Sequence, residues 1–155
     1  MRIRPYRPGD RAACHEIFFH AVREGAAPYY DRAQRCAWAP ANTPAPDTPD
    51  KLLDQTCWVA EISGNPAGFM SLTGTGHIDM AFVLPHLRGK GVAAALYDRL
   101  LDHGRAVSLP RLTSHASHLF QRFLLRRGWR IDHAETVTPN GIALERFHMT
   151  LDPLS

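Results

Sequence analysis

The sequence is poor in cysteine and has no long apolar run. Its three cysteines, Cys14, Cys36 and Cys57, are about twenty residues apart and form no C-x-x-C pair, which fits neither a disulfide framework nor a zinc site. No apolar run approaches the roughly 20 residues of a membrane helix, and the first residues show no signal-peptide core. We therefore expect a cytoplasmic protein with reduced cysteines and no membrane segment.

Excess charge of one sign is also lacking. The chain of 155 residues has 18 basic and 15 acidic residues, which gives a formal net charge of +3. Only Lys51 and Lys90 are lysines, and the arginines are spread along the chain, so no nucleic-acid surface is expected. Arginine nevertheless suits the phosphates of a nucleotide. With 45% apolar residues, this length predicts a single domain over residues 1–155 with its own core.

The hydrophobic pattern predicts a mixed α/β fold. Strands are expected over 2–7, 57–62, 67–73, 76–84, 111–115, 129–137 and 142–151, with the second, third and fourth forming an antiparallel meander. Helices are expected over 10–22, 29–38, 92–101 and 117–127. A proline-rich loop follows the second helix and leads to a brief helix over 49–54.

A glycine loop, Arg88–Ala93, lies between an expected strand and an expected helix. The free N–H groups and the dipole at a helix start attract anions, and small residues let a phosphate approach the backbone. The chain has no G-x-x-x-x-G-K-[ST] motif and no G-x-G-x-x-G after the first strand, which disfavours a P-loop and a Rossmann site. Taken alone, the loop could also be a tight turn before a helix.

The motif Arg88-x-x-Gly91-x-Ala93 resembles the [QR]-x-x-G-x-[GA] signature of the GNAT (general control related N-acetyltransferase) superfamily. The order of elements resembles that fold along nearly the whole chain, and Ser117–Trp129 resembles its other recurrent segment. The segment Gln34–Pro40 is similar to one in the YafP-like branch of small bacterial members. The resemblance implies a largely antiparallel, twisted sheet of about seven strands, splayed in the middle and flanked by about four helices.

The resemblance also implies acetyl-CoA as co-substrate and assigns residues to it. The pyrophosphate would lie on the backbone of Arg88, Gly89, Lys90, Gly91, Val92 and Ala93. Phe82 and Val83 would pair with the pantetheine like an added strand, and the thioester would enter the gap before the strand at 111–115. Ser117 matches a position that often contacts the cofactor arm.

His77 and Asp79 are the candidates for the base that deprotonates an acceptor amine. Being two residues apart on a strand, they should share the face opposite Ile78, Met80 and Phe82. Histidine titrates near neutral pH, and Asp79 matches the carboxylate that histone-type family members use as general base. The alternative is a solvated polar pair without a catalytic role.

The sequence departs from the family pattern at the proton donor. Many members carry a tyrosine four residues before the glycine of the glycine-aromatic pair, and here that position is Leu124. A thiol of pKa about 8.5 leaves as thiolate at a cost of roughly 2 kcal/mol at pH 7, so water could serve. The candidate donors within the chain are Tyr29, Tyr30, His115 and Ser117.

Aromatic residues supply the candidate acceptor site. Tyr29, Tyr30 and Trp38 lie where family members place the acceptor walls, and we group His115 with them; core packing is the alternative for Trp38. The spacing of His115 and His118 is a weak metal signal, because a strand-to-helix break intervenes and no third ligand is near, so no metal is expected.

The leading hypothesis is an N-acetyltransferase that moves acetyl from acetyl-CoA directly to a primary amine. No cysteine matches a nucleophile position, which disfavours an acyl-enzyme. The acceptor, a small molecule or a peptide, and the acyl chain length are left open. A homodimer is an expectation because dimers are common in the family. The alternatives are a non-catalytic acyl-CoA-binding or regulatory module and a small nucleotide-binding protein.

Overall fold

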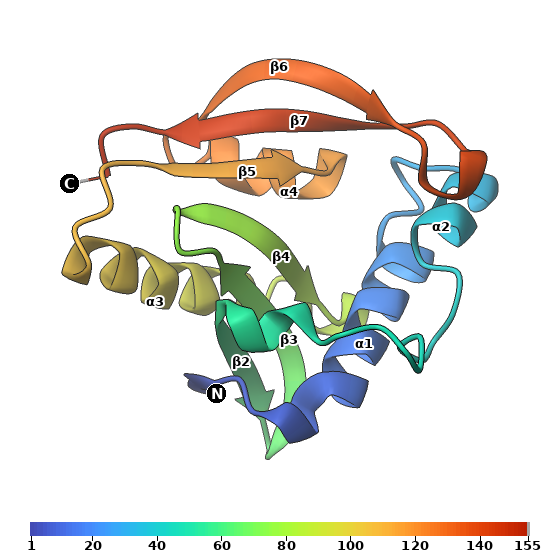
Figure 1. The fold of residues 1–155 in the computed structure, drawn as a ribbon, viewed down its shortest axis with the longest axis horizontal. Coiled ribbons are helices and arrows are strands. Elements are labelled where there is room, and N and C mark those ends of the chain that lie inside the picture. Colours follow the sequence, from blue (N-terminus) through green and yellow to red (C-terminus); the bar gives the residue numbers. More distant parts are fainter. Residues whose placement is uncertain (155) are drawn as a thin grey trace.

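One seven-stranded sheet organises the computed structural model, which describes residues 1–154 (Figure 1). The strands are β1 (Arg2–Pro5), β2 (Thr56–Ile62), β3 (Asn65–Leu72), β4 (His77–Val83), β5 (Leu112–Ala116), β6 (Arg130–Val137) and β7 (Leu144–Leu151). Their order in the sheet is β1-β2-β3-β4-β5-β7-β6, and only the β4–β5 pair is parallel. The expected mixed α/β fold with a largely antiparallel sheet is confirmed.

Four α-helices flank this sheet: α1 (Arg11–His20), α2 (Arg32–Trp38), α3 (Val92–Ala106) and α4 (His118–Leu125). A π-helical turn, Ala21–Gly25, continues α1. The second helix was expected from residue 29, and this start is wrong. Asp31 is the N-cap, because its carboxylate accepts from Gln34 N–H while Gln34 Oε1 accepts from Asp31 N–H, and this capping box sets the first turn.

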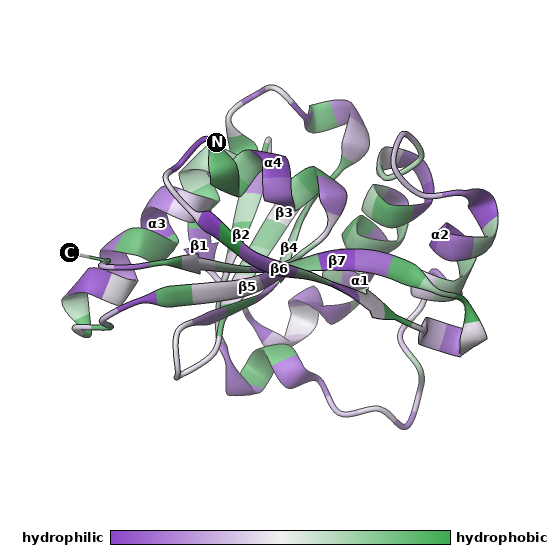
Figure 2. Cartoon of the chain, turned by 90° about the horizontal axis from the view of Figure 1, so that it is seen from above, coloured by the Kyte–Doolittle hydropathy of each residue, from purple (hydrophilic) through white to green (hydrophobic). Residues whose placement is uncertain are grey.

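The helices cover the two faces of the sheet differently. On one face α1 packs on β3 and β4, around Ile17 and Phe69; on the other face α3 packs on β1 to β4, around Leu96 and Leu100. Helix α4 packs on β5 and β7. Strand β6 is the last strand of the sheet order, and most of its residues are exposed. In Figure 2, which looks from above, β6 crosses the middle of the picture and carries both hydrophilic and hydrophobic residues.

Strands β4 and β5 pair only at their first residues. His77 is in register with Thr113 and Ile78 with Ser114, and beyond this point the two ribbons diverge (Figure 1). The other edge of β4 stays paired with β3 from Ile78 to Val83, apart from Asp79. The backbone of Phe82 and Val83 therefore has no strand partner on the β5 side, as the splayed sheet predicted.

A β-bulge in β4 overturns one expectation. The register of β3 with β4 skips Asp79, so the alternation of side chains shifts by one residue at this point. As a result Ile78 packs in the cluster with α3, whereas Met80 and Phe82 pack in the cluster with α1. The prediction that these three residues share one core face is wrong.

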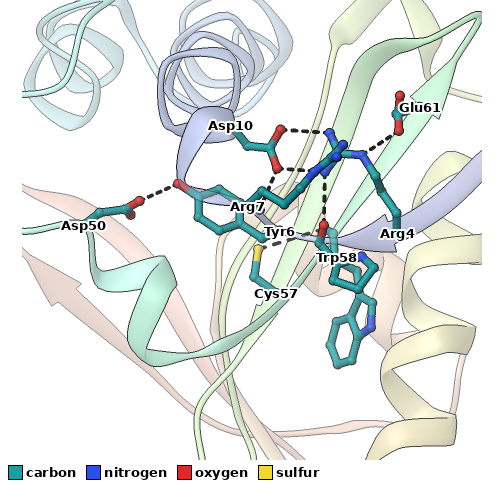
Figure 3. A network of polar contacts seen from close by, with 9 residues as sticks. Arg4, Tyr6, Arg7, Asp10, Asp50, Cys57, Trp58 and Glu61 are labelled. Carbon is teal, nitrogen blue, oxygen red and sulfur yellow. Dashed lines mark hydrogen bonds and ion pairs between the residues drawn. The ribbon is translucent and has the colours of Figure 1, made fainter.

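A buried polar network fixes the N-terminal strand to the segment before β2 (Figure 3). Arg4 in β1 donates to both carboxylate oxygens of Asp10 at 2.7 and 2.8 Å, and also to Glu61. Tyr6 Oη donates to Asp50 Oδ2 at 2.5 Å. Because Asp50 caps the 3-10 turn Lys51–Asp54, the network also positions this turn.

Candidate active site

A cavity of about 650 Å³ lies where β4 diverges from β5, between the turn after α1, the glycine loop and α4. It collects most of the residues expected to bind the cofactor: Phe82, Val83, Arg88, Gly89, Gly91, Val92, Ala93 and Ser117. Tyr29 and Trp38 line the same cavity, whereas Lys90 is exposed and does not. Residues that are distant in sequence and were predicted separately thus border one space.

The glycine loop ends in a backbone conformation that leaves room for a ligand. Gly89 and Gly91 have φ values of +77° and +80°, and a Cβ added at either would meet no heavy atom within 4 Å. Gly91 caps α3, whose first hydrogen bond runs from Ala95 N–H to Gly91 O. The amides of residues 92–94 precede that bond, so this helix start fits a phosphate group.

The side chain of Arg88 serves a contact within the protein. Its Nη1 donates to Gly25 O at 2.9 Å and so joins the glycine loop to the turn that follows α1. Burial lowers the pKa of Arg88. Arg88 therefore borders the cavity as part of the glycine loop, while its guanidinium group binds the carbonyl oxygen of Gly25.

Three arginines of the α4 region, Arg122, Arg126 and Arg127, also line the cavity, and we did not single them out from the sequence. Arg122 Nη1 donates to Tyr29 Oη at 3.1 Å, and the Arg127 guanidinium lies 3.6 Å from the centre of the Phe123 ring. The sequence did carry a signal, namely three arginines within six residues of one expected helix. We missed it because arginines are spread over the whole chain.

Ser117 and Tyr30 have structural partners. Ser117 is the N-cap of α4, and its Oγ accepts from Phe120 N–H at 3.2 Å. Tyr30 is 3% exposed; its hydroxyl donates to Glu145 O at 2.7 Å and accepts from His118 N–H at 3.1 Å. Tyr30 is not among the cavity residues, whereas Ser117 is, with its hydroxyl proton still available to donate.

Asp79, at the bulge of β4, is held by side chains that precede β2. Lys51 Nζ lies 2.9 Å from Asp79 Oδ2, and Gln55 Nε2 donates to the same oxygen at 3.0 Å. Burial raises the pKa of Asp79, but the hydrogen bonds from Gln55 and Lys51 outweigh it, so the pKa lies below its usual range. We did not predict either partner, since both contacts are long-range.

His77 and His115 lie side by side near the paired end of β4 and β5. His77 Nδ1 shares a hydrogen bond of 2.8 Å with Thr113 Oγ1, and its ring centre lies 4.5 Å from that of His115. Desolvation is the main cause that lowers the pKa of both, to about 4 for His115. Neither histidine, nor Asp79, is among the residues that line the cavity.

Leu124 is fully buried in the core cluster with Leu100, Tyr97 and Trp129. Trp129 Nε1 donates to Tyr97 Oη at 2.8 Å, so this tyrosine of α3 is a packing residue. The position where many family members carry a tyrosine therefore points into the core of this chain.

Comparison with known proteins decides the family. Residues 46–151 match the model of the acetyltransferase (GNAT) domain. Over 153 residues, 99% of this chain and 97% of the relative, the sequence is 33% identical to YafP, an uncharacterized N-acetyltransferase of Escherichia coli K12. The chain belongs to the GNAT acetyltransferases. The resemblance stated from the sequence, including the YafP-like branch, is confirmed.

Solved structures of GNAT acetyltransferases share the fold. A GCN5-related N-acetyltransferase from Rhodopseudomonas palustris is 34% identical, with a TM-score of 0.90 over 97% of this chain and 94% of that chain. The acetyltransferase YncA of Salmonella typhimurium, solved with its cofactor acetyl-CoA, is 24% identical, with a TM-score of 0.67 over 98% and 93%. This GNAT chain is thus an acetyltransferase enzyme. No helix within residues 1–154 has the length and apolar character needed to cross a membrane.

Proposed function

We propose that this GNAT enzyme transfers acetyl from acetyl-CoA to a primary amine of a small molecule or peptide, by direct attack within a ternary complex. The observation that carries the proposal is the cavity, because it joins the unpaired edge of β4 to the glycine loop at the start of α3. YncA, which shares the fold, is described with acetyl-CoA as its cofactor.

The cavity suggests how the co-substrate is oriented. The pyrophosphate lies on the backbone of the loop Arg88–Ala93, where both glycines leave open space. The pantetheine amides pair with the backbone of Phe82 and Val83, on the side where β4 has no strand partner. The arginines of the α4 region balance the remaining phosphate charge.

The reaction then needs a base, an oxyanion donor and a proton for the leaving thiolate. The amine nitrogen attacks the thioester carbonyl, a backbone N–H near Phe82 or Val83 holds the oxyanion, and the C–S bond breaks. Asp79 or His77 takes the amine proton through water, since neither lines the cavity. Water, Ser117 or Tyr29 protonates the CoA thiolate, and no metal enters these steps.

The acceptor reaches the thioester past aromatic side chains. Tyr29 and Trp38 line the cavity, and the Trp38 ring meets Phe82 edge-on with centres 6.2 Å apart. These rings form an apolar wall beside the expected position of the thioester, so we propose acceptors with an apolar or aromatic group next to the amine. His115, which we grouped with these aromatic residues, does not line the cavity.

Calorimetric titration with acetyl-CoA, with ATP as control, tests the co-substrate, and thiol release against a panel of amines tests the reaction. Saturable binding of acetyl-CoA together with amine-dependent thiol release is the expected result. Binding of ATP in preference to acetyl-CoA would contradict the proposal. The cytoplasmic location, the homodimer and the lack of nucleic-acid binding stay predictions.

A further inference from the structure

A cluster of histidines lies on β5, β6 and β7, outside the cavity described above. Ala116 of β5 and Met149 of β7 belong to the core. Their neighbours His115 and His148 therefore point to the opposite face of the sheet, because side chains alternate along a strand. Glu135 of β6 joins them on this face, since it contacts His148.

The strand register builds the cluster. His148 is in register with His115 on one side and with His133 on the other. The ring centre of His148 lies 4.1 Å from that of His115 and 4.2 Å from that of His133. Glu135 faces Arg146 across the β6–β7 pair. Two imidazoles and a carboxylate are thereby placed together by three strands.

Three of these side chains are close enough to share one ion. One ligand atom from each of His115, Glu135 and His148 lies within 4.8 Å of the others. Two atoms bound to one tetrahedral Zn²⁺ at about 2.0–2.1 Å are about 3.4 Å apart. Small side-chain rotations therefore suffice to close the set around an ion.

Two further observations support this arrangement. His148 Nε2 is buried and lies 2.6 Å from Glu135 Oε2, so two of the three ligand atoms already converge on one point. Arg146 donates to Glu135 Oε1 and so fixes the orientation of the carboxylate. Metal sites commonly hold their carboxylates by such a second hydrogen bond.

We propose that His115, Glu135 and His148 bind one divalent transition-metal ion of the Zn²⁺ type, with a further coordination position open to solvent. Two imidazoles and one carboxylate suit Zn²⁺ and its neighbours in the first transition row, whereas Mg²⁺ and Ca²⁺ prefer oxygen ligands alone. His115 is exposed, which gives an ion a path to the site. The inference is independent of the proposed acetyl transfer.

Calorimetric titration of ZnSO₄ into the full chain, stripped with a chelator and free of acetyl-CoA, tests the proposal. We expect one equivalent of Zn²⁺ to bind saturably and MgCl₂ to give no binding. Co²⁺ in place of Zn²⁺ should give the visible absorption of a four- or five-coordinate site. No saturable Zn²⁺ binding by the folded protein would overturn the proposal.

Variants locate the ion. His115→Gln and Glu135→Gln should each weaken Zn²⁺ binding by at least about a hundredfold, because loss of an outer-sphere partner alone costs up to that much. His20→Gln is the matched control, since His20 of α1 is paired with Glu16 of the same helix and with Glu24 of the turn that follows it. Circular dichroism checks that each variant is folded. Because His115 is exposed, His115→Gln should leave the fold intact. Unchanged Zn²⁺ affinity in folded His115→Gln would overturn the assignment.

Discussion

Lys51 Nζ lies 2.9 Å from Oδ2 of Asp79, so the carboxylate proposed as a base already holds a cation before any amine arrives. Gln55 donates to the same oxygen. Lys51 belongs to the 3-10 turn before β2, and Gln55 is the residue that ends this turn; the Tyr6–Asp50 hydrogen bond anchors the turn to the residue that follows β1. An ammonium acceptor must therefore compete with Lys51 for this carboxylate.

Asp79→Asn should lower kcat by about 10²–10⁴ if this residue is the base, as loss of a general base typically does. The matched control is Asp54→Asn, which changes an exposed carboxylate in the 3-10 turn that carries Lys51. Thiol release at saturating acetyl-CoA measures the effect. Full activity in Asp79→Asn would transfer the role to His77.

Lys51→Met tests the role of Asp79 in a second way, through the pH dependence of kcat/KM. Lys51 is one cause that lowers the pKa of Asp79, so its removal should raise this pKa. The carboxylate is then protonated at higher pH, and the acidic limb of kcat/KM should move upward in pH. Asp54→Asn leaves the limb in place. An unmoved limb in Lys51→Met would show that Asp79 does not control it.

Gly91→Glu should eliminate acetyl-CoA binding, because the new side chain would project its carboxylate into the space left for the pyrophosphate. Gly64→Glu is a close control: Gly64 has a φ of +79° against +80° for Gly91, and an added Cβ would also meet open space. Both variants lose about 1–2 kcal/mol of folding stability from backbone strain. Calorimetry should find normal binding only in Gly64→Glu; normal binding in both would contradict the phosphate loop.

Arg126→Ala should raise the Kd for acetyl-CoA about tenfold, the cost of one charge-assisted hydrogen bond. Arg126 lines the cavity and is exposed, so its removal leaves the core intact. Arg130→Ala, whose side chain pairs with Asp132 on β6, is the control. Titration with 3′-dephospho-CoA locates the contact. If Arg126 binds the 3′-phosphate, this ligand has the same Kd for Arg126→Ala and for the unmodified enzyme. Equal Kd values for acetyl-CoA in Arg126→Ala and the unmodified enzyme would rule out the contact.

Elements with a regular pattern could be predicted from the sequence. The strands Thr56–Ile62 and Asn65–Leu72 and the start of α3 lie close to their expected bounds, because alternation and glycine punctuation are local signals. The splay of β4 and β5 was implied by the family resemblance alone. A bulge inserts one residue without changing the composition of a strand, so the shift at Asp79 left no trace in the pattern.

The parts of the site that were missed depend on contacts distant in sequence. Lys51 reaches Asp79 from the brief helix that was expected after the proline-rich loop, and nothing in that segment indicated this contact. The histidine cluster needs the register of β5 with β7 and of β7 with β6, which no spacing within one segment reveals. Hydrophobic periodicity reports which face of an element is buried, whereas these contacts depend on how separate elements align.

Leu124→Tyr tests whether the family's usual proton donor could be restored. Leu124 is 0% exposed and packs in the core, so a tyrosine there should destabilise the fold by about 1–3 kcal/mol through overpacking. It should not raise kcat, because the position does not line the cavity. Leu125→Tyr, at a neighbouring residue that is 45% exposed, should change neither stability nor activity. A higher kcat in Leu124→Tyr would show that this side chain reaches the thiolate.

Asp10→Asn should destabilise the enzyme by about 3 kcal/mol at pH 7, because it removes the charge that pairs with the buried Arg4. Arg4 then retains only its ion pair with Glu61. Arg4 holds the pKa of Asp10 below its usual range. A carboxylate with a lowered native pKa stabilises the fold fully above its unfolded pKa of about 4 and loses this contribution as the pH falls through the native pKa.

The difference in unfolding free energy between Asp10→Asn and the unmodified enzyme should therefore be largest near pH 7 and shrink below about pH 4. Urea unfolding at several pH values measures it. Asp47→Asn, an exposed carboxylate in the proline-rich loop, should show no such dependence. A difference that stays constant down to pH 3 would mean that Asp10 has the same pKa in the folded and the unfolded enzyme, so that Arg4 does not lower the pKa of Asp10.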